Sequence, residues 1–162
     1  MLAMSFAALQ LNAQKVGYID TEKILGAIPA YTSAQAELES LNSRYQKEIE
    51  AEYAKIETMY NSYQSQKAYL SAQVRQQREN EIIAREQAVK QLQAKYFGQD
   101  GYMQKKSDEL LAPIKNKVDE AVKAVAGAGK YMIILDIASM QGVAYADRAY
   151  DLSSEVIKNL GY

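Results

Sequence analysis

The chain has 162 residues, of which 48% are hydrophobic and 24% are charged, and its formal net charge at pH 7 is −1. It contains no Cys and no His, which excludes disulfides, thiolate metal sites and thiol nucleophiles and removes the commonest general base. The near-zero net charge provides no overall attraction to nucleic acid, so no nucleic-acid partner is expected.

The N-terminal segment, residues 1–13, carries no charge and contains an apolar run that is too short to span a bilayer. We interpret it as the rear part of a secretory signal peptide, with cleavage after Ala13. The alternative is a disordered or helical N-terminus of a cytosolic protein.

A short strand and a short helix are expected next. Residues 15–20 are β-rich and predict the strand. Asp20 or Thr21 is placed to cap a helix over 22–28, and Pro29 is expected to end that helix.

A long antiparallel helical hairpin is predicted over residues 32–126, with its reversal near 69–72. The segment has few glycines and is rich in Gln, Glu, Lys, Arg and Ala, all compatible with helix. Thr32 or Ser33 is expected to cap the outgoing helix, and Ser71 the return helix. Apolar residues recur at heptad-like spacing, as in the seam of a coiled coil. The seam comprises Ile49, Tyr53, Ile56, Tyr60 and Tyr63 on the outgoing helix and Ile82, Val89, Tyr96, Met103 and Leu110 on the return helix.

Two glycines and a proline are the candidate hinges of the return helix. Gly98 and Gly101 lie inside the seven-residue phase that joins Tyr96 to Met103. The helix is therefore expected to stay in register there, weakened but not looped out. Pro113 should add a second bend. The alternative for the glycine pair is close packing without a hinge.

The C-terminal segment predicts two more strands and a helix. Residues 131–136 are apolar on both faces, which indicates a strand covered on both sides. Residues 142–147 alternate, as in a strand with one exposed face. Ser153 is expected to cap the final helix, with Leu152 and Ile157 forming a hydrophobic staple.

The fold class expected is therefore α+β, with a small body formed by 14–31 and 127–162. Three short strands and two short helices cannot cover a strand that is apolar on both faces, and open sheet edges favour pairing with another chain. A symmetric oligomer is expected, with strands joined across subunits. The residues expected at these contacts are Val16, Tyr18, Ile133, Leu135, Val143 and Tyr145.

Five segments together carry a resemblance to a known family. They are Lys-Val-Gly-Tyr-Ile-Asp-Thr-Glu-Lys-Ile-Leu at 15–25, Leu-Leu-Ala-Pro-Ile at 110–114, Tyr-Met-Ile-Ile-Leu-Asp at 131–136, Val-Ala-Tyr-Ala-Asp at 143–147 and Asp-Leu-Ser-Ser-Glu-Val-Ile-Lys-Asn-Leu at 151–160. With the hairpin between them, they resemble the Skp (OmpH-like) family of periplasmic chaperones. The resemblance implies a homotrimer with an intersubunit β-barrel body and three helical tentacles around a cavity. It further implies that this cavity holds unfolded outer-membrane proteins in the periplasm without ATP.

Client contacts are expected from apolar side chains off the strict seam, because exposed Met and aromatic residues make adaptable contacts. The candidates are Met59, Tyr69, Phe97 and Tyr102. The alternative is ordinary scattered surface apolars. Seam tyrosines 53, 60, 63 and 96 are instead expected to pack between the two helices.

Charge along the hairpin is segregated. Residues 37–58 hold three basic and six acidic residues, and residues 64–95 hold six basic and three acidic ones. The basic tip is represented by Lys67, Arg75, Arg78 and Arg85. It is by default a solvated face, and the alternative is contact with lipopolysaccharide or a membrane surface. Members of the family often have strongly basic arms, whereas this chain is nearly neutral. Capture of clients or lipopolysaccharide by charge is therefore not expected to be the main driving force.

Catalysis is not expected. Asp20, Asp136 and Asp147 each end a strand and so are candidates for a metal or acid–base cluster, but Asp is favoured at such turns in any case. No Gly-rich phosphate-binding loop is present, and no catalytic residue, metal or cofactor is predicted. The rival to a chaperone is a structural coiled-coil spacer or scaffold. An enzyme is the remaining alternative.

Overall fold

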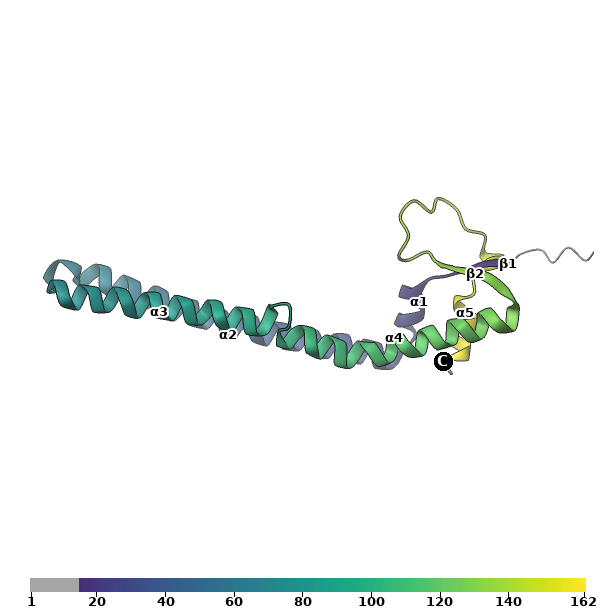
Figure 1. Ribbon diagram of the computed structural model, residues 1–162, viewed down its shortest axis with the longest axis horizontal. Helices are drawn as coiled ribbons and strands as arrows, with labels where there is room; N and C mark the ends of the chain where they lie inside the picture. The colour runs from purple at the N-terminus through teal and green to yellow at the C-terminus, as the bar shows by residue number, and fades with distance from the viewer. Residues whose placement is uncertain (1–14) are drawn as a thin grey trace, which may run out of the picture. The chain divides into compact units, whose positions relative to one another are not determined.

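The computed structural model describes residues 15–162, so the predicted signal segment lies outside the described residues. The chain forms two compact units, an arm over 30–114 and a body formed by 15–29 and 115–162. The elements (Figure 1) are β1 (Lys15–Ile19), α1 (Thr21–Gly26), α2 (Pro29–Gln66), η1 (Lys67–Tyr69), α3 (Ala72–Phe97), α4 (Tyr102–Gly129), β2 (Tyr131–Asp136), η2 (Arg148–Tyr150) and α5 (Ser153–Asn159). Helix α4 contributes its first turns to the arm and its last turns to the body.

The body contains a parallel pair of strands, β1 and β2, in which Val16 lies opposite Ile133 and Tyr18 opposite Leu135. Because side chains alternate across a strand, these four share one face of the sheet. The opposite face packs on the start of α5. Gly17 permits this packing, since a Cβ there would lie 2.5 Å from Leu152 Cδ1.

The third strand predicted for the body does not form, and that prediction was wrong for the single chain. Residues 143–147 have no regular secondary structure, and Val143 and Tyr145 are exposed. Strand β2 is not covered on both faces either, because Ile133 and Leu135 are also exposed. A strand needs a hydrogen-bonded neighbour, and the described chain does not supply one for 143–147.

Helix α1 begins as predicted and packs on α5. The Asp20 carboxylate accepts a hydrogen bond from the Lys23 amide, so Asp20, and not Thr21, is the cap of the two predicted candidates. Ile24 of α1 and Val156 of α5 are completely buried. The expected capping role of Ser153 was wrong. Its hydroxyl leaves the helix end and accepts a hydrogen bond from the Asp20 amide at 2.9 Å.

Helix α2 begins at Pro29, earlier than the predicted caps Thr32 and Ser33. Proline is well suited to the first helical position, where its φ is already helical and its missing N–H has no partner to lose. Pro29 therefore starts α2, whereas α1 already ends at Gly26, before the predicted end at residue 28.

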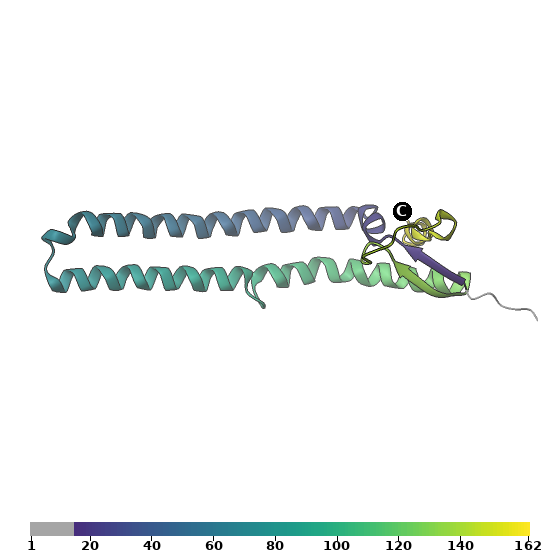
Figure 2. The same ribbon diagram turned by 90° about the horizontal axis from the view of Figure 1, so that it is seen from above.

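The two sides of the arm run side by side along α2 and α3 (Figure 2). Their shared core contains alternate predicted seam positions of α2 and the first three predicted seam positions of the return helix, and both sets repeat every seven residues. It consists of Ile49, Ile56, Tyr63, Ile82, Val89 and Tyr96. The intervening positions Tyr53 and Tyr60 are 44% and 50% exposed, so the prediction that they pack between the helices was wrong. Tyr63 and Tyr96 do pack there, as predicted.

The chain reverses through η1, and Ser71 caps α3 as predicted, accepting a hydrogen bond from the Val74 amide. The return helix then breaks between Phe97 and Tyr102, where Figure 2 shows the chain leaving the helical line. The expectation of an unbroken, weakened helix was therefore wrong.

The two glycines are needed at this break because the loop folds back on its own backbone. A Cβ at Gly98 would lie 2.4 Å from the Ala94 carbonyl oxygen, and one at Gly101 would lie 2.7 Å from that of Tyr96. Heptad spacing alone could not reveal this. Pro113 lies inside α4, which continues past it to Gly129.

Candidate functional site

An aromatic cluster lies in the arm beside the break. The rings of Tyr45 and Tyr96 stack at 3.9 Å between centroids, with their planes 7° apart. Phe97 meets both rings edge-on, and Tyr102 lies tilted against Tyr96. Such arrangements add to the stabilisation given by burial alone. The cluster therefore joins α2, α3 and α4 where the return helix is interrupted.

Polar groups orient this cluster. The Tyr96 hydroxyl donates to the Glu48 carboxylate at 2.9 Å, and this hydrogen bond is the main reason that the pKa of Tyr96 is raised. The Arg44 guanidinium lies 5.4 Å from the centre of the Tyr45 ring, and Lys95 Nζ lies 5.2 Å from that of Tyr102. Both distances allow cation–π attraction.

A groove of about 490 Å³ opens on the side of the cluster that lies toward the start of the arm. The α4 residues that line it share one helical face, because they are spaced by three or four residues. Those residues are Tyr102, Lys105, Lys106 and Glu109, and they face Glu37, Leu41, Arg44 and Tyr45 of α2. Lys106 Nζ contacts Glu37 at 3.1 Å and Glu109 at 3.2 Å, and these contacts raise the pKa of Lys106.

The four predicted client contacts occupy different surroundings. Tyr69 is 90% exposed at the reversal. Phe97 and Tyr102 are about two-fifths exposed but also belong to the aromatic cluster. Met59 is only partly exposed and packs on the edge of the arm core. The structure therefore brings Phe97 and Tyr102 together and leaves Tyr69 separate.

The cations of the predicted basic tip already make contacts within the arm, which leaves them less free to bind a partner. Lys67 Nζ lies 5.4 Å from the centre of the Tyr63 ring, and Arg75 donates to the carbonyl of Leu70 at 3.1 Å. Arg78 pairs with Glu81, and Arg85 lies 3.9 Å from Glu52 across the hairpin. These cations mostly satisfy groups within the arm itself.

Sequence reasoning missed Tyr45 as a centre of the cluster and Ile83 as an exposed apolar residue. Ile83 lies with Tyr60 along a surface hollow of about 330 Å³. The available signal for Tyr45 was the apolar spacing near the base of the outgoing helix, where Leu38, Leu41, Tyr45 and Ile49 follow at three, four and four residues instead of in strict heptad alternation. The heptad register was the available signal for Ile83, because it places Ile82 on the seam and Ile83 one residue off it.

The six residues predicted for oligomer contacts lie in the body, and five of them are exposed. Val16, Ile133 and Leu135 are between 40% and 45% exposed, and Tyr145 is 82% exposed. Val143 is also exposed, whereas Tyr18 is half-buried. Four of the six share the open face of the β1–β2 sheet.

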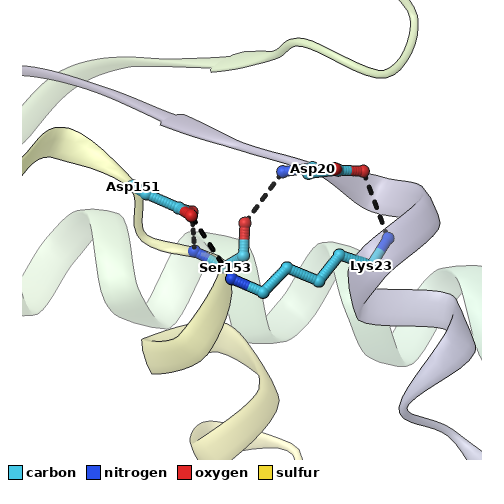
Figure 3. A network of polar contacts seen from close by, with 4 residues as sticks. All are labelled: Asp20, Lys23, Asp151 and Ser153. Atoms are coloured by element: carbon cyan, nitrogen blue, oxygen red, sulfur yellow. Dashed lines mark hydrogen bonds and ion pairs between the residues drawn. The ribbon is translucent and has the colours of Figure 1, made fainter. Parts of the chain in front are cut away.

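A polar network ties β1 and α1 to the segment before α5 (Figure 3). Asp151 accepts hydrogen bonds from the Ser153 amide at 2.9 Å and from Lys23 Nζ at 3.3 Å. Burial by itself would raise the pKa of Asp151, but the hydrogen bonds from Ser153 and Lys23 outweigh it and lower that pKa. The charged carboxylate therefore stabilises the folded body.

The three carboxylates predicted to end strands have local capping or turn roles. Asp20 caps α1, Asp147 accepts from the Ala149 amide, and Asp136 accepts from the Ala138 amide as well as from the distant Thr21. Within residues 15–162, no three acidic side chains are grouped as a metal site would require. Over the same residues, no helix is both long and apolar enough to cross a membrane.

We expect Asp151→Asn to lower the free energy of unfolding by about 1 kcal/mol at pH 7, because the charge-assisted bonds are weakened. A carboxylate whose folded pKa is lowered stabilises the fold above its unfolded pKa, and that stabilisation is lost as the pH falls through the folded pKa. The difference in free energy of unfolding between the wild type and Asp151→Asn should therefore shrink below about pH 4. Urea midpoints of both proteins at pH 7 and pH 3 measure this. An equal deficit at the two pH values would contradict the role of the charge.

Comparison with known proteins places the chain in a family. Residues 15–160 match the family described as outer membrane protein (OmpH-like). Chaperone protein Skp of Yersinia enterocolitica is 23% identical over 154 residues, covering 95% of this chain and 90% of that protein. Chaperone protein Skp of Vibrio cholerae is 27% identical over 150 residues, covering 90% and 83%.

A solved structure has the same fold. The crystal structure of an OmpH-like protein from Caulobacter crescentus matches with a TM-score of 0.69 at 14% identity, covering 91% of this chain and 84% of that one. The family match spans almost all of the described residues and confirms the resemblance found in the sequence. The chain belongs to the OmpH-like (Skp) family.

Proposed function

We propose that this protein is a periplasmic holdase chaperone that binds unfolded outer-membrane proteins without ATP. The relatives from Yersinia and Vibrio are named chaperones, and the family match extends over residues 15–160. In this proposal the arm binds and shields client segments, and no chemical step follows.

The observation that carries the proposal is the distribution of apolar side chains on the arm. Tyr53, Tyr60 and Ile83 are exposed beside the buried core residues of the hairpin, and Tyr69 is exposed at the reversal. Spreading such residues over a long polar hairpin produces many weak contact points. Weak, adaptable contacts suit a protein that must accept many unfolded chains and release them.

The proposed assembly is a homotrimer joined through the open sheet face of the body, with clients held in a cavity between the three arms. The exposed apolar side chains of Val16, Ile133 and Leu135 supply a surface that another subunit would cover. Residues 143–147 would gain a strand partner in the same step. Contact of the basic tip with lipopolysaccharide or a membrane surface is a further part of the proposal.

The test is aggregation of a urea-unfolded outer-membrane β-barrel protein on dilution, followed by light scattering with and without the chaperone in ATP-free buffer. Native mass spectrometry of the same mixture gives the subunit number and shows whether the client is held. Suppressed aggregation together with a mass equal to trimer plus client is expected. A chain that leaves aggregation unchanged would refute the holdase function.

We expect joint replacement of Tyr69, Phe97 and Tyr102 by Ser to weaken client retention about tenfold, since each truncation removes apolar contact area. Competition against an unlabelled client measures the change. The control, Tyr150→Ser with Tyr162→Ser, removes two exposed tyrosines of the body. Unchanged affinity in an intact oligomer would remove these residues from the client surface.

The second candidate is a structural spacer or scaffold. The observation that favours it is the continuous core of the arm, reinforced by polar bonds across the hairpin such as Tyr96–Glu48 and Lys106–Glu37. A spacer would keep one rigid geometry and would show no affinity for unfolded chains. The aggregation assay therefore separates the two functions.

A further inference from the structure

We infer that the groove beside the aromatic cluster binds an extended client segment in which an aromatic side chain neighbours a carboxylate. The inference rests on the proposed function, because it names the kind of client segment that the arm takes at this place. The groove has an apolar part and a cationic part, and both lie within the arm.

Two tyrosine rings form the apolar part. Tyr102 is 44% exposed and Tyr45 is partly exposed, so each ring presents an edge or face to the groove. A volume of about 490 Å³ lies within the range of ligand sites and is large enough for an aromatic side chain and a stretch of backbone. An aromatic side chain should bind here more strongly than an aliphatic one, because offset or edge-on ring contacts add to the free energy of burial.

Two cations supply the polar part. Arg44 and Lys105 line the groove, are exposed, and form no ion pair with any residue in the described part of the chain. Lys106 differs from them, because Glu37 and Glu109 already contact its ammonium group. Arg44 and Lys105 are therefore the groups left to bind a carboxylate, and a charge-assisted hydrogen bond is the contact that they would make.

The remaining charges argue against a densely charged phosphate ligand. Glu37 and Glu109 lie in the same groove, and together with Lys106 they leave one negative charge there. With Arg44 and Lys105 the groove carries a net charge of about +1, which matches a single carboxylate. A lipid phosphate cluster would be repelled by the two carboxylates. An acidic, aromatic peptide segment fits both halves of the groove.

The helix break explains why these groups meet. The Lys105 amide donates to the Gly101 carbonyl at 3.1 Å, so α4 restarts directly after the loop. Four residues lie outside the helices between Phe97 and Tyr102, so α4 is a separate helix whose first turn carries the groove residues. Tyr102 and Lys105 share one face of that turn because they are three residues apart.

The test uses short fluorescein-labelled peptides of Gly and Ser that carry Phe-Asp, Phe-Asn or Ala-Asp, with binding followed by fluorescence anisotropy. We expect the full-length assembly to bind the Phe-Asp peptide about tenfold more tightly than either of the others, because each of those lacks one half of the ligand. Arg44→Ala with Lys105→Ala should abolish the preference for Asp over Asn. The matched control, Lys47→Ala with Lys90→Ala, removes the same charge from exposed positions outside the groove and should keep the preference.

Several outcomes would overturn the inference. They are equal binding of all three peptides, an unchanged preference in the groove variant, or displacement of the Phe-Asp peptide by pyrophosphate at lower concentrations than by unlabelled peptide. The last outcome would assign the groove to polyanions instead. Failure of the proposed function is seen separately, because a protein that is not a holdase would leave aggregation of an unfolded outer-membrane protein unchanged.

Discussion

Replacing both Ile133 and Leu135 by Glu is expected to convert the proposed trimer into monomers. Their side chains are 45% and 40% exposed on the open face of the body sheet, together with Val16. Covering this face in an assembly would bury the new carboxylates, and an unpaired buried charge costs several kcal/mol. Two such costs exceed what a small interface can offset.

The measurement is molar mass by light scattering during gel filtration. The matched control is Tyr69→Glu with Ile83→Glu, which replaces two exposed apolar residues of the arm by the same charges. The control should keep the wild-type mass. If the body variant also keeps it, the sheet face is not the subunit contact.

Ile24→Ala is expected to lower the free energy of unfolding of the body by about 2–5 kcal/mol. Ile24 is completely buried and lies on α1, which packs on α5 where Val156 is also completely buried. The truncation removes apolar contacts and leaves a cavity that this small core can only partly close. A loss of this size is a large share of the stability of an ordinary domain, about 5–15 kcal/mol.

Hydrogen exchange measures this effect locally, because exchange of the slowest amides follows the free energy of opening. In the variant, amides of β2 and α5 should exchange about a hundredfold faster, while those of α3 serve as an internal reference in the arm. Ile83→Ala, at a half-exposed arm position, is the matched control and should change neither set. Unchanged protection of β2 would show that Ile24 is not central to the body core.

Much of the arm was predictable because its signals are local. The seven-residue spacing of Ile49 and Ile56, and of Ile82 and Val89, places side chains on one face of a helix whatever the rest of the chain does. Ser71 was also identified correctly, since an N-cap depends only on the next few residues.

The exposure of Tyr53 and Tyr60 could not be predicted in the same way. Spacing shows that a residue can face the partner helix, but the rotation of the two helices decides which seam positions are covered. The core residues, such as Ile49 and Ile56, fill the space between α2 and α3. Tyr53 and Tyr60, which lie between the core positions in the sequence, remain about half exposed. The break at Gly98 and Gly101 was hidden for a related reason, because Tyr96 and Met103 keep heptad spacing across it.

In the body, the missing third strand and the displaced role of Ser153 have a common cause. Both depend on partners distant in sequence. Residues 143–147 have no strand beside them in the described chain, and the Ser153 hydroxyl is drawn to the Asp20 amide, 133 positions earlier. The residues adjacent in sequence to either segment therefore give no information about its partner.

The sequence by itself determined the family, the hairpin, the positions of its main apolar layers and the cap at Ser71. These features follow from periodicity and from contacts between near neighbours. Only the tertiary structure decided where the return helix breaks, which tyrosines are exposed and which cations share a groove with Tyr45 and Tyr102. Those features depend on how two helices rotate against each other, and that rotation is set by packing over the whole length of the arm.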